Sequence, residues 1–171
     1  MEKKKILKIF IGCLPADTVQ HHLKSYFNRF CRVACFKIKY RSNGVCSGYG
    51  HFICTNPNKA VLQKLFNSTH YYKDRDLECR PYLKGSALES YQKEFNMRRV
   101  YVKNLPPYMT DVELKQEFSK FGKVYRAYRA NKPDKKGISF GFVIFTHQGV
   151  IEQIIDSDIY LKGYKIEIKK V

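Results

Sequence analysis

The chain has 171 residues, of which 44% are hydrophobic and 27% charged, a composition typical of globular proteins and not of disordered ones. Its 32 Lys and Arg against 15 Asp and Glu give a net charge of +17, which favours a polyanionic partner. No apolar run approaches the roughly 18 residues that a membrane helix needs, and the basic N-terminal segment MEKKKILKIFIG lacks a signal peptide's long apolar stretch.

The polar chemistry of the sequence does not resemble that of an enzyme. The five histidines are scattered, and no paired carboxylates, nucleophile motif or phosphate-binding loop occurs, so we expect no catalysis, no cofactor and no metal. The six cysteines form no CxxC motif, and we interpret them as buried free thiols of an intracellular protein. They are Cys13, Cys31, Cys35, Cys46, Cys54 and Cys79.

The first half of the chain alternates strand and helix patterns. We predict a strand at 6–13, a helix at about 17–29, strands at 33–40 and 48–54, a helix at 57–67 and a strand at 76–80.

The segment GSALESYQKEFNMRR follows this half. Ser86 and Glu89 have the spacing of a capping box, and three apolar residues share one helical face: Leu88, Tyr91 and Phe95. The segment is either a short helix lying on a sheet or an extended stretch that becomes ordered when the partner binds.

The second half repeats the same order of elements. RRVYVKNL is a strand, and Thr110 with Glu113 forms a capping box for the helix of TDVELKQEFSKFG. The remaining patterns predict a strand in KVYRAYRA, a basic turn in NKPDKKG, a strand in SFGFVIF, a helix in QGVIEQIID and a strand in YKIEIKKV with Ile166 and Ile168 inward.

The two halves overlay on each other. A shift of 91 residues places Phe10 on Tyr101 without a gap through the third strand, after which the shift becomes 89. We therefore predict an α+β fold of two ferredoxin-like βαββαβ domains, each with a four-stranded antiparallel sheet, two helices on one face and the other face open. The domains are 1–84 and 98–171, joined by a linker at 85–97.

Two short motifs carry a family resemblance. The second half has Val100-Tyr-Val-Lys-Asn-Leu105 on its first strand and Ile138-Ser-Phe-Gly-Phe-Val-Ile-Phe145 on its third; the first half has Ile9-Phe-Ile-Gly-Cys-Leu14 and Ser47-Gly-Tyr-Gly-His-Phe-Ile-Cys54. Both halves resemble RNA recognition motifs, although neither long motif has the basic residue that usually opens it. Their tandem arrangement is similar to the heterogeneous nuclear ribonucleoprotein A/B and Musashi type.

The resemblance implies that aromatic rings on the open face stack on unpaired bases. Tyr101 and Phe142 would each hold one base, Phe140 would rest against the sugars, and Gly141 would face the helices. The matching residues of the first half are Phe10, His51 and Tyr49.

Basic residues at or near outward positions would contact phosphates: Lys8, Lys37, Lys39, Arg80, Lys103 and Lys169. The lysines of the basic turn are either such contacts or solvated charges. Residues 1–84 have 16 basic and 5 acidic side chains (+11), whereas residues 85–171 have 16 and 10 (+6). We hypothesise that the first domain mainly grips backbone and the second mainly holds bases.

The expected function is sequence-selective binding of single-stranded RNA by a monomer, in mRNA processing or regulation, in the nucleus, the cytoplasm or both. Two alternatives remain open. The first domain could bind a protein partner, or the chain could bind single-stranded DNA such as telomeric repeats, because stacking does not require a 2′-hydroxyl.

Overall fold

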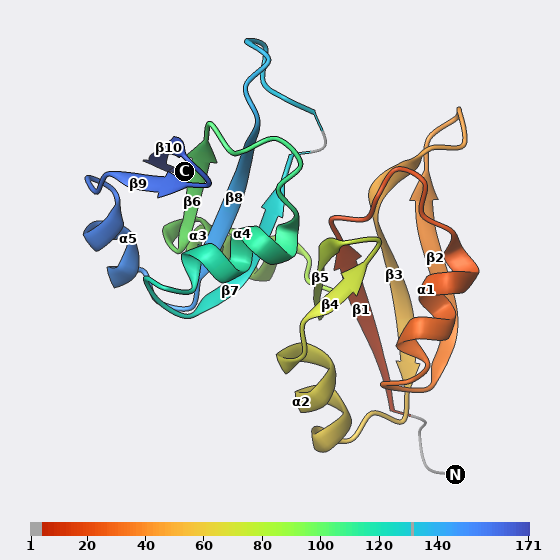
Figure 1. Cartoon of the computed structure of the whole chain (residues 1–171). Helices are drawn as coiled ribbons and strands as arrows, with labels where there is room; N and C mark the ends of the chain where they lie inside the picture. The colour runs from red at the N-terminus through yellow and green to blue at the C-terminus, as the bar shows by residue number, and fades with distance from the viewer. Residues whose placement is uncertain (1–4, 131) are drawn as a thin grey trace. The chain divides into compact units, whose positions relative to one another are not determined.

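Each half of the chain folds into an antiparallel sheet with two helices on one face, and the second half has a further helix on the other face, as Figure 1 shows. The computed structural model describes residues 5–130 and 132–171 and divides the chain into two units, Met1–Leu83 and Lys84–Val171. The N-terminal residues 1–4 and Asn131 of the basic turn lie outside the described residues.

The first unit contains β1 (Ile6–Gly12), α1 (Gln20–Phe27), β2 (Val33–Tyr40), β3 (Cys46–Thr55), α2 (Lys59–Asn67), β4 (His70–Tyr72) and β5 (Arg75–Pro81). The second contains α3 (Gly85–Met97), β6 (Arg99–Lys103), α4 (Asp111–Phe118), β7 (Val124–Arg129), β8 (Phe140–Phe145), α5 (Gly149–Ile154), β9 (Ile159–Leu161) and β10 (Tyr164–Lys170). The ferredoxin-like fold predicted from the sequence is confirmed.

The described part of each unit has one more strand than predicted. The sheet orders are β2-β3-β1-β5-β4 and β7-β8-β6-β10-β9, so each sheet has five strands, not four. The additional strands, β4 and β9, are three residues long and reach the next strand through a two-residue turn. Both residues of each turn have positive φ (Lys73 and Asp74, Lys162 and Gly163), as a tight hairpin turn requires.

The helix ends differ from the sequence prediction where side chains bond to the backbone. Helix α2 begins at Lys59 because the side chain of Asn58 accepts a hydrogen bond from the Val61 amide. Helix α1 begins at Gln20, later than predicted, because Thr18 belongs to a turn in which its hydroxyl donates to the Pro15 carbonyl.

Of the two predicted capping boxes, one forms. At α4, Thr110 and Glu113 make both reciprocal bonds, and hydrogen bonds from Lys162 and then from Thr110 lower the pKa of Glu113 to about 2. At α3 the prediction is wrong, because the helix begins at Gly85 and Ser86 already lies in its first turn. Lys84 takes the N-cap position and makes no side-chain bond there.

The core of each unit lies between the sheet and its helices. Val100, Val102, Val143 and Phe145 are fully buried, and Ile166 and Ile168 are 4% and 8% exposed. All six belong to one apolar cluster, as the alternation in the sequence predicted. Because alternate residues of a strand point to opposite faces, their neighbours lie on the other face of the sheet.

Four of the six cysteines, Cys31, Cys46, Cys54 and Cys79, are buried in the core of the first unit. Burial, with Cys54 nearby, raises the pKa of Cys31 to about 12, and burial also raises the pKa of Cys79. The four thiols therefore act as small apolar side chains, and those of Cys31 and Cys79 do not ionise near neutral pH.

A buried histidine joins α1 and α2 to the sheet of the first unit. His70 is 2% exposed, its Nδ1 lies 2.9 Å from the Tyr26 hydroxyl, and its Nε2 lies 2.6 Å from the Leu65 carbonyl oxygen. Burial lowers its pKa below the ordinary 6.5, so the folded protein favours the neutral ring.

Unfolding is therefore expected to become easier in mild acid. The unfolded chain binds a proton at His70 near pH 6.5, which the folded chain resists, so this part of the stability is lost as pH falls below about 6.5. Urea unfolding at pH 7.5 and at pH 5.5 measures the loss. The His70→Gln variant should show a smaller difference between the two pH values; an equal difference would contradict the assignment.

Candidate functional site

The open face of the second sheet carries a row of aromatic rings. Phe142 on β8 is paired with Tyr101 on β6 and with Tyr128 on β7, and Lys169 on β10 is paired with Tyr101. The ring centroids of Phe142 and Tyr101 are 5.6 Å apart, and those of Phe142 and Tyr128 are 5.5 Å apart. Phe140 adds a fourth ring, 5.3 Å from Tyr101. All four rings are half-buried.

The backbone at Gly141 determines how closely β8 approaches β7. A Cβ atom at this position would lie 2.6 Å from the Tyr128 carbonyl oxygen and 3.1 Å from Cδ1 of the core residue Leu105. Gly141 thus faces the helices, as expected, and its lack of a side chain allows β7 to lie close enough for Tyr128 to meet Phe142.

Two arginines flank the row on one side, since Arg99 and Arg126 are both paired with Ile144, and Arg126 is buried at 3% exposure. The Arg126 guanidinium carbon is 4.9 Å from the Tyr128 ring centroid. The guanidinium carbon of Arg99 is 5.0 Å from the centroid of Phe142 and 5.7 Å from that of Phe95 on α3. These distances place Arg99 between two rings in cation–π contact.

Tyr128 and Arg99 were not among the site residues predicted from the sequence. Strand alternation could have found Tyr128, because its neighbour Ala127 is fully buried in the core and Tyr128 must then point outward.

Helix α3 covers one end of this open face. Ile144 alternates with the core residues Val143 and Phe145 and so points away from the core, yet it is fully buried. The covering element is α3, whose Phe95 is 9% exposed and which lies on the opposite side of the sheet from α4 and α5 (Figure 1). The helix therefore packs against the second sheet, whereas the sequence had left its position open.

The predicted cations of the second unit are paired with carboxylates. Lys169 Nζ lies 2.7 Å from Glu167 Oε1, and Lys103, which is paired with Phe140, lies 3.6 Å from Asp134 Oδ2. Hydrogen bonds from the backbone of Ile138 and Lys136 lower the pKa of Asp134 and hold it charged. The Lys169 pair is exposed and weak enough for a phosphate to replace the carboxylate, whereas the Lys103 pair is half-buried.

The open face of the first unit is built around Phe10. His51 and Arg80 are its partners on the neighbouring strands, and the Tyr49 ring, 46% exposed, is 6.4 Å away and nearly parallel to it. The Arg80 guanidinium carbon lies 4.0 Å from the centroid of Phe10, while its Nε lies 2.8 Å from Glu78 Oε1. Arg80 thus occupies one face of the ring on which a base would stack.

Several cations surround this face. Lys37 is paired with His51, and Lys39 is exposed farther along β2. Lys8 Nζ lies 4.0 Å from the centroid of Tyr82, whose ring is 5.9 Å from that of His51. Burial, followed by the charges of Lys8 and Lys37, lowers the pKa of His51, so this ring is neutral at pH 7. The sequence analysis missed Tyr82.

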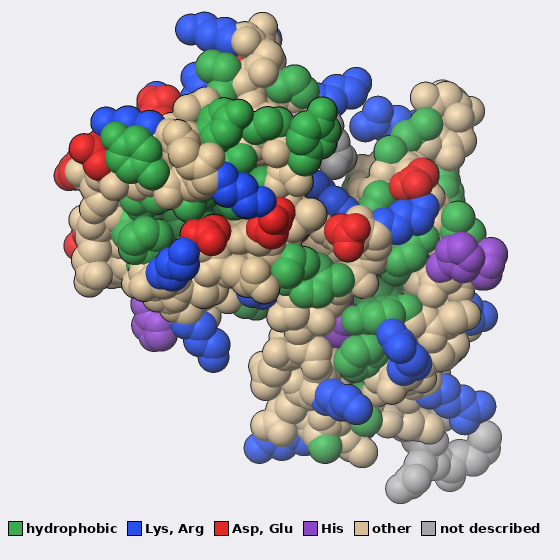
Figure 2. Space-filling view, in the orientation of Figure 1, with side chains coloured by type: hydrophobic (Ala, Val, Ile, Leu, Met, Phe, Trp, Pro, Cys, Tyr) green, Lys and Arg blue, Asp and Glu red, His purple; other side chains and the backbone are tan. Residues whose placement is uncertain are grey.

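The difference in net charge between the units is also visible on the surface away from the aromatic rings. On the helix-bearing side drawn in Figure 2, Asp and Glu side chains are more frequent over the second unit than over the first. Among the described residues, no cluster of His, Cys, Asp and Glu has the size of a metal site, and no helix is long and apolar enough to span a membrane.

The chain is similar to several known proteins. Residues 100–167 match the family model of the RNA recognition motif. The chain is 29% identical to heterogeneous nuclear ribonucleoprotein 27C of Drosophila melanogaster over 99% of its length and 26% identical to mouse (Mus musculus) DAZ-associated protein 1 over 97%. It spans only 40% and 44% of these two relatives.

Among solved structures, the chain resembles one from the rna15, hrp1 and anchor RNA 3′ processing ternary complex. The TM-score is 0.61 at 22% identity, and the match covers 96% of this chain and 95% of the other. The RNA-binding domain of Hrp1 in complex with RNA gives a TM-score of 0.51 at 21% identity, with 96% of both chains covered. These likenesses show the fold.

Proposed function

We propose that the chain is a tandem RNA recognition motif protein of the heterogeneous nuclear ribonucleoprotein type, and that it binds single-stranded RNA on its two open sheet faces. The observation that carries this proposal is the row Tyr128, Phe142 and Tyr101, which lies opposite the core, with Lys169 at one end and Arg99 beside Phe142. Flat, half-exposed rings on a rigid sheet stack on unpaired bases whatever the base.

We further propose that the two units have different roles in RNA binding. The second unit holds bases, because its four rings form a contiguous surface. The first unit grips the phosphate backbone, because Lys8, Lys37 and Lys39 surround a ring that Arg80 already covers on one side. The names of the relatives support a role in mRNA processing, in the nucleus or the cytoplasm.

This division predicts how binding responds to salt. If about five to eight phosphates are neutralised, log K should fall with log salt at a slope of roughly −3.5 to −5.6. The double variant Lys37→Ala with Lys39→Ala should make the slope less steep by about 1.4, because each phosphate contact to a single strand contributes about 0.7.

Fluorescence anisotropy from 50 to 300 mM salt measures this slope. The control is Lys59→Ala, which removes an exposed lysine from the helical side of the same unit. A flat salt response, or a slope that Lys59→Ala changes as much as the double variant does, would contradict the division. Matched RNA and DNA oligonucleotides in the same assay test whether the partner is RNA or single-stranded DNA.

A protein partner for the first unit is the second candidate, and the Arg80 contact on Phe10 favours it, since a base must displace this side chain. The Phe10→Ala variant of the full chain separates the two candidates. RNA binding by the first unit predicts a loss of RNA affinity, whereas a protein-binding first unit predicts unchanged RNA affinity.

A further inference from the structure

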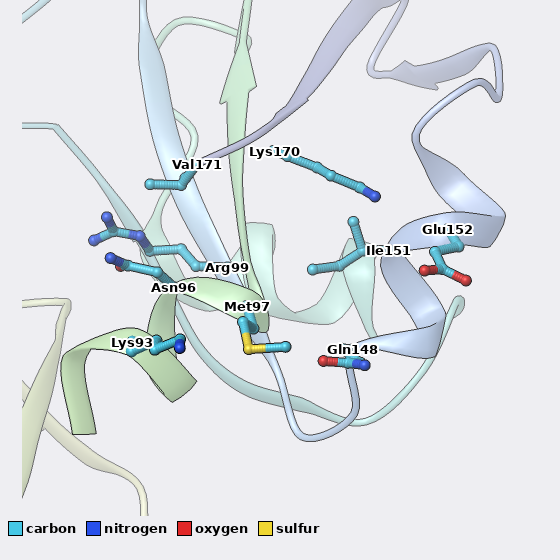
Figure 3. A pocket seen from close by; sticks show the side chains of 9 residues that line it. All are labelled: Lys93, Asn96, Met97, Arg99, Gln148, Ile151, Glu152, Lys170 and Val171. Atoms are coloured by element: carbon cyan, nitrogen blue, oxygen red, sulfur yellow. The ribbon is translucent and has the colours of Figure 1, made fainter. Parts of the chain in front are cut away.

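A pocket opens at the end of the second sheet, where α3, β10 and the start of α5 meet. Its volume is about 430 Å³, within the range of pockets that hold small ligands. Figure 3 shows its lining: Lys93, Asn96, Met97, Arg99, Gln148, Ile151, Glu152, Lys170 and Val171. All of these residues belong to the second unit.

The pocket adjoins the row of rings. Arg99 lines the pocket and also lies 5.0 Å from the centroid of Phe142, so one side chain borders both. Lys170, another lining residue, follows Lys169 but is paired with Val100 and points to the other face of β10, so Arg99 is the lining residue that contacts the row. A strand of RNA that leaves Phe142 in this direction therefore reaches the pocket after passing Arg99.

Helix α3 prevents the strand from continuing straight across the sheet. It covers Ile144, which is fully buried, and it is held in place by Arg98, whose Nη1 donates to the Phe145 carbonyl at 3.3 Å. The α3 residues Lys93, Asn96 and Met97 instead form one wall of the pocket, and residues from and beside α5 face them (Figure 3). The helix thus ends the flat stacking surface and opens a hollow beside it.

The lining has the chemistry of a nucleotide site. Met97 and Ile151 offer apolar contact for a base, and the amides of Asn96 and Gln148 can both donate and accept hydrogen bonds. Lys93, Arg99 and Lys170 supply positive charge for a phosphate. Glu152 has the only side-chain carboxylate among the lining residues, and an ionised carboxylate accepts hydrogen bonds but donates none.

We propose that this pocket takes one further nucleobase, next to those stacked on Phe142 and Tyr101, and that it prefers a base with an exocyclic amino group. Adenine, cytosine and guanine can donate such a group to Glu152, whereas uracil has no amino group and its N3–H donor lies between two carbonyl oxygens that the carboxylate repels. The inference rests on the proposed RNA-binding function and adds a specificity element to it.

The first test compares two single-stranded RNAs, one of which is longer by a single adenosine, added at the 5′ end or at the 3′ end in turn. One of the two additions should raise the affinity of the full chain by about tenfold. The double variant Asn96→Ala with Gln148→Ala should lose this gain and still bind the shorter RNA as the unchanged chain does. The control variant is Gln153→Ala, an exposed amide of α5 outside the lining.

The second test replaces the added adenosine by uridine. The unchanged chain should lose most of the gain, and Glu152→Gln, which keeps the shape but removes the charge, should accept both bases about equally. The proposal for the pocket is overturned if the added nucleotide does not raise the affinity. It is also overturned if the gain in affinity persists in Asn96→Ala with Gln148→Ala, or if the base preference persists in Glu152→Gln. If the shorter RNA still binds in these cases, the proposed RNA-binding function stands and only the proposal for the pocket fails. If the unchanged chain binds neither RNA, both proposals fail.

Discussion

Replacing Tyr101 and Phe142 together with Ala is expected to lower the affinity of the chain for single-stranded RNA by about 30-fold or more. Each base stacked on an aromatic ring contributes about 1–3 kcal/mol, and each 1.4 kcal/mol corresponds to about a factor of ten. The two rings are neighbours across β6 and β8, 5.6 Å apart, so their removal takes away two adjacent stacking surfaces. Fluorescence anisotropy with a labelled RNA measures the loss.

The fold should survive this change, because neither ring belongs to the buried core cluster of the second unit. The conservative pair Tyr101→Phe with Phe142→Tyr should retain most of the affinity, since both positions keep a ring. A further control is Tyr160→Ala, which removes a tyrosine that is 62% exposed on β9, outside the row. If the double Ala variant melted normally and still bound RNA as tightly as the unchanged chain, the rings would not hold the bases.

The second large effect, a loss of stability, is expected when either of two glycines beneath the open faces is replaced. Gly141→Ala would place a Cβ atom 2.6 Å from the Tyr128 carbonyl oxygen, and Gly50→Ala would place one 2.5 Å from the Lys37 carbonyl oxygen. Both contacts are with the backbone of a neighbouring strand, which cannot swing aside as a side chain can. Each substitution is therefore expected to lower the free energy of unfolding by about 1–3 kcal/mol, as overpacking does.

Gly149→Ala provides the matched control for these two variants. A Cβ atom at Gly149 has no neighbour within 4 Å, and this residue is helical, so Ala should be neutral or stabilising by a few tenths of a kcal/mol, to about 1. Urea unfolding of the three variants separates the cases. Equal stability of Gly141→Ala and Gly149→Ala would mean that β7 and β8 can move apart without cost.

The features of this structure that could be predicted are those that depend on residues close together in the sequence. Phe142 and Tyr101 could be assigned to the open face because Val143 and Val100 beside them are apolar, and the period of two then decides the side. The Thr110 capping box is equally local, since both partners lie within one turn of helix. The repeat strengthened the first prediction, because Phe10 and His51 stand at the matching positions of the first half, but not the second, since Val19 and His22 match Thr110 and Glu113.

The remainder depends on contacts between distant segments. Residues 70–72 and 159–161 are too short for alternation to reveal a strand, and they become strands only because a two-residue turn brings them to β5 and β10. Likewise, the apolar face around Phe95 predicted a helix but not the sheet that it covers. The stacking of Arg80 on Phe10 depends on side-chain conformation, which no sequence pattern specifies.

The central claim is that unpaired nucleotides cover the rings of the open faces. Titration of the isotope-labelled full chain with a single-stranded RNA, followed by NMR, tests it residue by residue. The account predicts that the largest shifts occur at Tyr101, Tyr128 and Phe142 and that RNA protons show direct contacts to these rings. Shifts confined to α4 and α5, with the ring signals of β6 and β8 unchanged, would contradict it.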